Sequence, residues 1–208
     1  MSTCLTKAEF EAQFGALHDR IFRRFDDGVA FDNGFFPSGF VNPDWQVVLL
    51  CDRIGFAACD IEDGEERNPD FPNEYEILLD VLAGKGVQEV VVTSARTMTL
   101  EMSSFVCRPD IDTVREGFVA CDVWCTELSI FDRTGLWGLF SHFDNYGVLG
   151  GAPEIMEPYI EKAGGLETIK HRFKAWAESQ SEGEWLEPEL RKIYDLAGWD
   201  DVTIARVT

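Results

Sequence analysis

Three histidines, His18, His142 and His171, are the side chains best suited to acid–base chemistry near neutral pH. The segment 141–146 (SHFDNY) places a serine hydroxyl, the carboxylate of Asp144 and the phenol of Tyr146 close to His142. A carboxylate beside an imidazole can orient the ring for proton transfer. One candidate enzyme site therefore lies near His142 and Asp144. Polar residues where a strand meets a loop are more often structural, so we predict no catalytic residue.

Sequence motifs for nucleophiles, metal ions and nucleotides are missing. The chain contains neither the GxSxG pattern of a nucleophilic serine nor the HExxH pattern of zinc proteases. In the acidic run 60–64 (DIEDG), the glycine comes too early for the calcium-binding loop of an EF-hand. The pair Gly84 and Gly86 follows a predicted helix, whereas a dinucleotide fingerprint follows a strand. We therefore expect no metal and no cofactor.

The cysteines are scattered along the chain without a CxxC pair: Cys4, Cys51, Cys59, Cys107, Cys121 and Cys125. They lie among apolar neighbours, and the N-terminus lacks the basic start and apolar run of a secretory signal. This pattern is typical of reduced, buried thiols in a cytoplasmic protein. Residues 121 and 125 would lie about 13 Å apart in a strand, which is too far for a disulfide or a shared zinc ion. We predict a cytoplasmic protein without disulfides.

The charge balance is the strongest compositional signal. Thirty-eight acidic residues against 18 basic ones give a formal net charge of -20. Nucleic acids and anionic membranes both need Lys or Arg to neutralise phosphate, so direct binding to either is disfavoured. The apolar runs are also far shorter than the roughly 18 residues of a membrane span. A basic protein partner is favoured, although acidity can also serve only to keep a protein in solution.

Much of the acidity lies in the segment 60–76, where eight carboxylates accompany the single Arg67. Pro69, Pro72 and Gly64 interrupt regular structure there, so we expect an exposed loop that steers a basic partner. Aromatic side chains from the glycine-rich loop 29–44 and from the region of Tyr146 are candidate anchors. The predicted partner-binding residues are Asp60, Glu62, Asp63, Glu65, Glu66, Asp70, Phe35, Phe36 and Tyr146, with Phe40 as a further candidate anchor.

The first half of the chain contains one long amphipathic pattern and several short apolar runs. Thr6 and Glu9 have the spacing of a capping box, and apolar residues then recur every three or four positions. Asn73 has the side chain of a helix cap. The predicted elements are a helix over 6–27, a hairpin of strands 45–51 and 54–59, a helix over 73–83 and a strand over 87–93.

The second half changes from strands to helices. A strand or helix is predicted within 97–106, and a short helix over 110–116. A strand over 119–125 is predicted to bulge or break before a hairpin of 128–130 with 136–143. Helices are predicted over 153–163, 166–179 and 188–197. Lys170, His171, Arg172 and Lys174 are expected on a basic side of the helix 166–179.

The order of these elements predicts one α+β domain over residues 1–208. An N-terminal helix precedes a mostly antiparallel sheet, and C-terminal helices pack on that sheet. The segment 145–152 is the place where a sheet core and a helical tail would separate.

Part of the second half resembles bacterial polymorphic-toxin immunity proteins. The similar segments are 130–138 (IFDRTGLWG) and 146–151 (YGVLGG), followed by Ile155, Met156 and Tyr159 before Gly164 and Gly165. They describe a turn, a Trp-bearing strand and the start of a helix, and they carry over no catalytic residue. The resemblance implies a cytoplasmic antitoxin that blocks a partner toxin.

Acidity and resemblance together favour one function. We expect a non-enzymatic immunity protein that neutralises a cognate bacterial toxin by occluding its active site, with carboxylates speeding encounter and aromatic anchors slowing release. One alternative is an enzyme with a site near His142 and Asp144. The other is an acidic nucleic-acid mimic that inhibits a nucleic-acid-binding protein. Carboxylates spaced regularly along one face would favour mimicry, whereas a single acidic loop would favour occlusion of a toxin.

Overall fold

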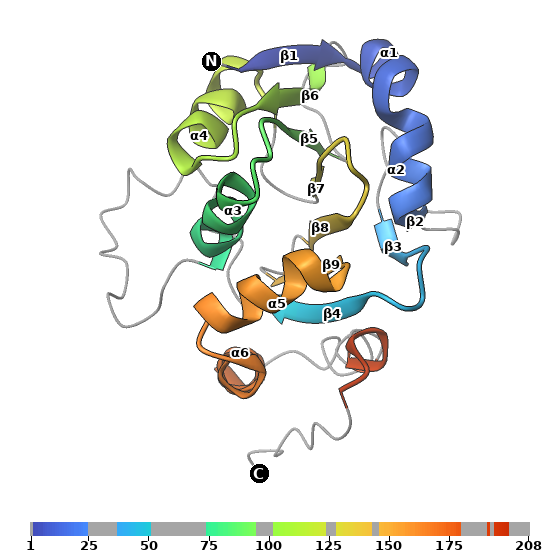
Figure 1. Cartoon of the computed structure of the whole chain (residues 1–208). Coiled ribbons are helices and arrows are strands. Elements are labelled where there is room, and N and C mark those ends of the chain that lie inside the picture. The colour runs from blue at the N-terminus through green and yellow to red at the C-terminus, as the bar shows by residue number, and fades with distance from the viewer. Residues whose placement is uncertain are drawn as a thin grey trace.

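The computed structural model shows a chain built around an antiparallel sheet of seven strands (Figure 1). It describes residues 2–24, 37–50, 74–94, 102–123, 128–142, 146–179, 191 and 194–199. The strand order is β1-β6-β5-β7-β8-β9-β4. The strands are β1 Thr3–Thr6, β4 Gln46–Leu50, β5 Val90–Ser94, β6 Met102–Cys107, β7 Leu128–Phe131, β8 Trp137–His142 and β9 Tyr146–Gly151, and a separate pair is formed by β2 Phe22–Arg24 and β3 Pro37–Phe40. The predicted α+β class, with a mostly antiparallel sheet, is confirmed.

Helices cover both faces of the sheet. They are α1 Lys7–Phe10, the π-helical turn η1 Glu11–Gly15, α2 Ala16–Ile21, α3 Glu74–Gly84, α4 Ile111–Ala120, α5 Pro153–Lys162 and α6 Leu166–Ser179. The first three follow one another without a break and form one helical run. Residues 194–197 are also helical. Within the described ranges, no helix combines the length and apolar character that crossing a membrane requires.

The strand register determines which helix lies on which face. A Cβ on Gly138 of β8 would stand 2.6 Å from Ile21 Cγ2, so this face of the sheet meets the end of α2. The next residue, Leu139, points to the opposite face. Register pairs across β7 and β5 place Phe105 on that face, where its ring contacts Gly117 of α4. The helices α1 and α2 therefore lie on one face, and α3 to α5 on the other (Figure 1).

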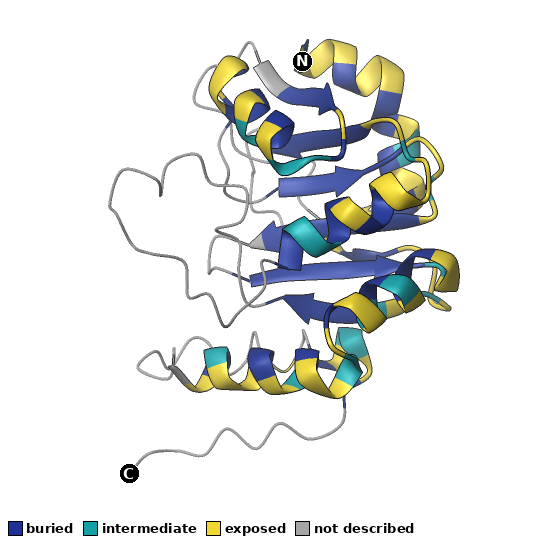
Figure 2. Ribbon diagram, turned by 60° about the vertical axis from the view of Figure 1, so that its left-hand side comes forward, coloured by how far each residue is buried: buried dark blue, intermediate teal, exposed yellow. Residues whose placement is uncertain are grey.

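The sheet has one edge that is covered by a helix. The strand β4 ends the described strand order, and α6 packs beside it. This packing shields backbone groups that an open edge would offer to another chain. Figure 2 shows the buried sheet, in which β5, β7 and β9 are buried along their whole length, whereas the helices carry their exposed residues on their outer sides.

The N-terminal helix begins as predicted but ends earlier. The capping box is confirmed, because Glu9 N donates to Thr6 Oγ1 at 3.2 Å and Thr6 N donates to Glu9 Oε2 at 2.8 Å. The helix ends at Ile21 and not near residue 27, because Phe22 adopts φ −109° and ψ 140°. Phe22 starts β2, whose pairing with β3 is a tertiary contact that the apolar pattern does not contain.

Most of the other predicted elements are confirmed. The helices predicted over 73–83, 153–163 and 166–179 are α3, α5 and α6, the strands predicted over 45–51 and 87–93 are β4 and β5, and the predicted hairpin is β7 with β8. The segment 97–106, which fitted either a strand or a helix, contributes β6. The described partner of β4 is β9, and the predicted partner strand 54–59 lies outside the described residues.

The prediction of a strand over 119–125 is wrong for the described residues, because residues 119 and 120 belong to a helix and residues 121 and 122 form a turn; residues 124 and 125 lie outside the described residues. Asp110 Oδ1 accepts a hydrogen bond from Thr113 N at 2.8 Å and caps α4, which continues to Ala120. Val114 and Phe118 pack inward from this helix. The alternation of apolar residues after residue 118 is typical of a strand, but the apolar residues at 114, 118 and 121 also fit the helical period.

The prediction of no disulfide is also wrong. Cys4 of β1 and Cys121, which follows α4, form a disulfide with a Cα–Cα distance of 5.3 Å across 117 positions. They meet because α4 packs on β6 next to β1. Cys107 is a free, buried thiol, and its burial raises its pKa to about 12. That thiol is therefore protonated and unreactive at neutral pH. The remaining cysteines, Cys51, Cys59 and Cys125, lie outside the described residues.

Candidate functional site

One end of the sheet, here called the loop end, is where two of the segments predicted to bind a partner are attached. Neighbouring strands start or stop there at Leu50, Ser94, Met102, Leu128, His142 and Tyr146. The chain leaves β4 at Leu50 toward the acidic segment, and β8 and β9 are joined through the segment 143–145. Tertiary structure thus connects the predicted steering loop and the region of the predicted anchor Tyr146 to the same end of the sheet.

A row of buried polar side chains crosses the sheet near the loop end, on the face that α2 covers. Ser104, Thr93 and Ser129 are register neighbours on β6, β5 and β7. Ser104 Oγ donates a hydrogen bond to Thr93 Oγ1 at 2.9 Å, and His18 Nε2 lies 3.3 Å from Ser129 Oγ. Each of these four residues is at most 1% exposed. The row therefore links α2 to three strands inside the core.

The contact between His18 and Ser129 has the distance of a base–nucleophile pair, but its surroundings are those of a core contact. The imidazole packs against Phe22 and Phe131, with ring centroids 4.8 and 5.8 Å away. Asp19 Oδ1 is 3.8 Å from Nδ1, which is beyond hydrogen-bond distance. A nucleophile has to be reached by its substrate, and Ser129 is 1% exposed. We interpret this contact as a polar cross-link that fixes α2 on the sheet.

A buried ion pair joins α3 to α6. Arg172 Nη2 lies 3.1 Å from Glu74 Oε1, and the two side chains are 7% and 3% exposed. The same Nη2 donates a hydrogen bond to the carbonyl of Ala163, directly after α5, at 3.0 Å. Arg172 thus connects three helices. The prediction that it belongs to an outer basic side is wrong, whereas His171 and Lys174 are exposed.

Of the residues predicted to bind a partner, the structure describes Tyr146 and the further candidate Phe40. Asp60, Glu62, Asp63, Glu65, Glu66, Asp70, Phe35 and Phe36 lie outside the described residues, as do Asp144 and the side chain of His142. Tyr146 is 3% exposed and its ring lies 6.1 Å from that of Trp176 on α6. Phe40 is 4% exposed and packs on Phe140. Neither of these two aromatics is a surface anchor in this structure, because each fills the core between a strand and its covering segment.

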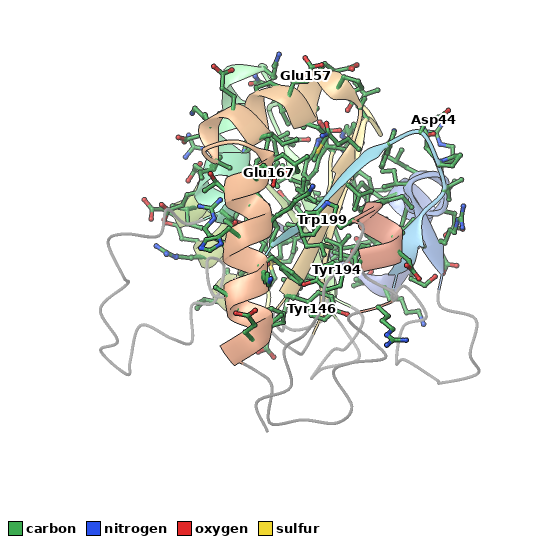
Figure 3. All side chains as sticks on the ribbon, turned by 90° about the horizontal axis from the view of Figure 1, so that it is seen from below. Asp44, Tyr146, Glu157, Glu167, Tyr194 and Trp199 are labelled. Atoms are coloured by element: carbon green, nitrogen blue, oxygen red, sulfur yellow. A yellow bond between two sulfur atoms is a disulfide. The ribbon has the colours of Figure 1, made fainter. Side chains whose placement is uncertain are left out.

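The described surface carries an acidic stripe outside the predicted partner-binding residues. Glu154, Glu157 and Glu161 are exposed on α5, and they recur at three and four positions, so they share its outer side. Ile155 and Tyr159 face the core from the same helix. Figure 3 shows Glu157 on α5 and Glu167 at the beginning of α6, both on the outside of the molecule. The periodicity of these glutamates within the predicted helix 153–163 was the signal that would have revealed the stripe.

The carboxylates of the stripe form no ion pair with a described residue. Lys162 of α5 pairs with Asp80 of α3 at 3.4 Å, and Lys170 pairs with Glu167 at 3.2 Å. No described cation forms an ion pair with Glu154, Glu157 or Glu161. These carboxylates are therefore available to the cations of a partner.

Neither a metal site nor a known relative identifies this surface. Among the described residues, no group of three or more His, Cys, Asp or Glu side chains could hold a metal ion. Comparisons with protein-family models, curated protein sequences and solved structures find no match to the chain. Function has to be inferred from the chemistry of the chain's own residues.

Proposed function

We propose that this chain is a non-enzymatic inhibitor of a basic protein, and specifically an immunity protein that neutralises a cognate bacterial toxin by covering its active site. The observation that carries the proposal is the acidity of the chain, whose formal net charge is -20 and whose exposed carboxylates of Glu154, Glu157 and Glu161 have no described counter-ion. The helix already fixes the backbone of these residues, so pairing with a partner's cations orders only their side chains. These carboxylates also raise the rate of encounter with a basic surface.

The described core supports binding over catalysis. Its reactive side chains take part in internal contacts or are enclosed: His18 meets Ser129, Glu74 meets Arg172, and the Cys107 thiol is protonated. The groups on the described surface that remain for a ligand are mostly carboxylates. A surface of this kind recognises a cationic protein through charge complementarity.

Co-expression with the products of neighbouring genes tests the proposal in cells. One of these products is expected to be toxic alone and harmless when this chain is present. Purified chain should then bind that product, with an association rate that falls as salt screens the charges. Protection without binding, or an association rate independent of salt, would contradict the proposed mode of inhibition.

Charge variants test which carboxylates steer the partner. Replacing Glu154, Glu157 and Glu161 by Gln is expected to slow association roughly tenfold, because steering depends on local potential. Asp112→Asn, Glu116→Gln and Asp122→Asn on and after α4 remove the same charge elsewhere and form the matched control. A third set, Asp60→Asn, Glu62→Gln and Asp63→Asn, tests the acidic segment. Equal slowing in all sets would mean that net charge, and not a surface, controls encounter.

The acidic stripe also favours the second candidate function, mimicry of nucleic acid. Steps of three and four residues along a helix separate the carboxylates by about 4.5 and 6 Å, so they form a regular line of negative charge. A nucleic-acid strand likewise carries one phosphate per ~3.4 Å of duplex axis. Competition distinguishes the two functions. If duplex DNA or RNA displaces the chain from its captured partner, the partner's nucleic-acid site is occupied, and mimicry replaces occlusion of a toxin's catalytic centre.

A further inference from the structure

The N-terminal strand β1 lies at the edge of the described sheet and is paired with another strand on one side only. It ends the described strand order, and its neighbour in the sheet is β6. Leu5 is the buried residue of this strand, at 5% exposure, whereas Thr3 is exposed. Beyond the ladder, Ser2 Oγ donates a hydrogen bond to the carbonyl of Thr113 on α4 at 3.1 Å. An edge strand with so little buried surface belongs to the least stable parts of a fold.

The Cys4–Cys121 disulfide fastens this strand to a more firmly packed element. Cys121 is 1% exposed and follows α4, whose Phe118 packs on Phe105 of β6 with ring centroids 5.1 Å apart. Cys4 lies on the strand itself and is partly exposed. A thiol in solution therefore reaches the disulfide from the side of Cys4.

The chain can bend at the end of β1, just after the disulfide-bonded Cys4. The register of β1 with β6 is irregular between Leu5 and Thr6, and Thr6 is the cap of α1. Phe10, one turn further, is fully buried in the core. Opening of β1 can therefore stop at Thr6 while the helical run stays in place.

We propose that the Cys4–Cys121 disulfide is a thiol-operated latch that fastens β1 to α4 and releases it on reduction. This inference does not depend on the proposed function. A donor thiolate attacks Cys4 Sγ, the sulfur–sulfur bond breaks, and the Cys121 thiolate leaves and takes up a proton. A second donor thiolate then attacks the donor sulfur bound to Cys4, and the Cys4 thiolate leaves and is protonated. The protein gains two electrons and two protons, and two donor thiols become one donor disulfide. Oxidised glutathione reverses the sequence.

The one other described cysteine does not interfere with this exchange. Cys107 lies on β6 opposite Val90, two positions from Phe105, which is the register partner of Cys4. It is 2% exposed, and burial raises its pKa to about 12, so it carries almost no thiolate to attack the disulfide. Reduction therefore depends on a donor from outside the described core.

Hydrogen–deuterium exchange of the full chain, before and after reduction with dithiothreitol, tests the latch. Reduction is expected to speed exchange of the amides of residues 3–6 by about tenfold or more, because the strand opens locally. The β8–β9 hairpin in the sheet interior should change by less than about twofold. Alkylation with mass spectrometry should find Cys4 and Cys121 blocked before reduction and labelled after it. Oxidised glutathione should restore slow exchange.

Variants distinguish a disulfide that holds only β1 in place from a disulfide that stabilises the whole fold. The double variant Cys4→Ser/Cys121→Ser should show fast exchange in residues 3–6 at all times and no response to dithiothreitol, whereas Cys107→Ala should respond like the parent. Unchanged exchange of residues 3–6 after confirmed reduction overturns the proposal. Exchange that accelerates throughout the sheet, including β8 and β9, also overturns it, because the disulfide would then stabilise the whole fold. Labelling of Cys4 before reduction would show that the latch does not form.

Discussion

The buried ion pair of Glu74 and Arg172 gives the most direct test of how the C-terminal helices are attached. Replacing Arg172 by Met keeps an unbranched side chain of similar length but removes the guanidinium. The Glu74 side chain, 3% exposed, would keep its negative charge in the core without that cation. Removing one partner of a buried ion pair costs about 3–5 kcal/mol. The hydrogen bond to the Ala163 carbonyl is lost as well, and because its donor is charged it contributes about 1.5–3 kcal/mol of this total.

This loss is large enough to measure by two methods. For a domain of this size, about 2–4 °C of melting temperature correspond to 1 kcal/mol, so Arg172→Met should melt roughly 6–20 °C lower. Urea unfolding should give a lower midpoint with an unchanged slope. Lys174→Met, on the exposed side of the same helix, is the matched control and should change stability by no more than about 0.5 kcal/mol.

A double variant separates the cost of the isolated charge from the cost of lost packing. Glu74→Leu together with Arg172→Met removes both charges and should recover most of the stability, because apolar pairs often replace buried ion pairs without loss. The reasoning is refuted if Arg172→Met costs less than about 1 kcal/mol. It is also refuted if the double variant is as unstable as Arg172→Met alone, since packing and not charge would then explain the loss.

Two further predictions concern packing and alkaline pH. A Cβ on Gly138 would lie 2.6 Å from Ile21 Cγ2 and Phe22 Cζ, so Gly138→Ala should lower the free energy of unfolding by about 1–3 kcal/mol. Gly84→Ala at the end of α3 meets nothing within 4 Å and should be neutral or stabilising, so equal losses in urea unfolding would contradict this reasoning. Burial, followed by the charge of Asp110, raises the pKa of Cys107 from 9.0 to about 12, and burial, followed by the charge of Glu178, raises the pKa of Tyr194 from 10.0 to about 12. Both groups hold their protons more tightly in the folded state than in the unfolded chain. Their contribution to the free energy of unfolding is therefore complete below about pH 9 and is lost as the pH rises toward 12. For Cys107 the loss reaches about 4 kcal/mol near pH 12. Cys107→Ala should flatten the fall of unfolding free energy above pH 9, and an unchanged pH profile would show that Cys107 is not responsible.

The sequence alone predicts the parts of this fold that depend on contacts between residues close in the chain. The capping box of Thr6 and Glu9 closes within four residues, and the hairpin of β7 and β8 turns within a short loop. The helix α5 starts at a proline and ends before a glycine pair. In each case the signal and the hydrogen bonds that it produces lie in the same few residues, so local propensity and periodicity are sufficient.

The remaining features are decided by contacts between distant residues. The end of the first helix depends on the pairing of β2 with β3, and the disulfide joins positions 117 apart. The burial of Arg172 depends on Glu74 at the start of another helix, and the burial of Tyr146 depends on α6. A sequence pattern records which side chains are apolar or charged, but not which distant side chain completes each pair. The sequence by itself therefore determined the strongly acidic character, the α+β class and most of the elements. Only the tertiary structure decided that the candidate anchor Tyr146 is buried and that Arg172 holds three helices together, because packing brings those residues next to partners that are distant in the chain.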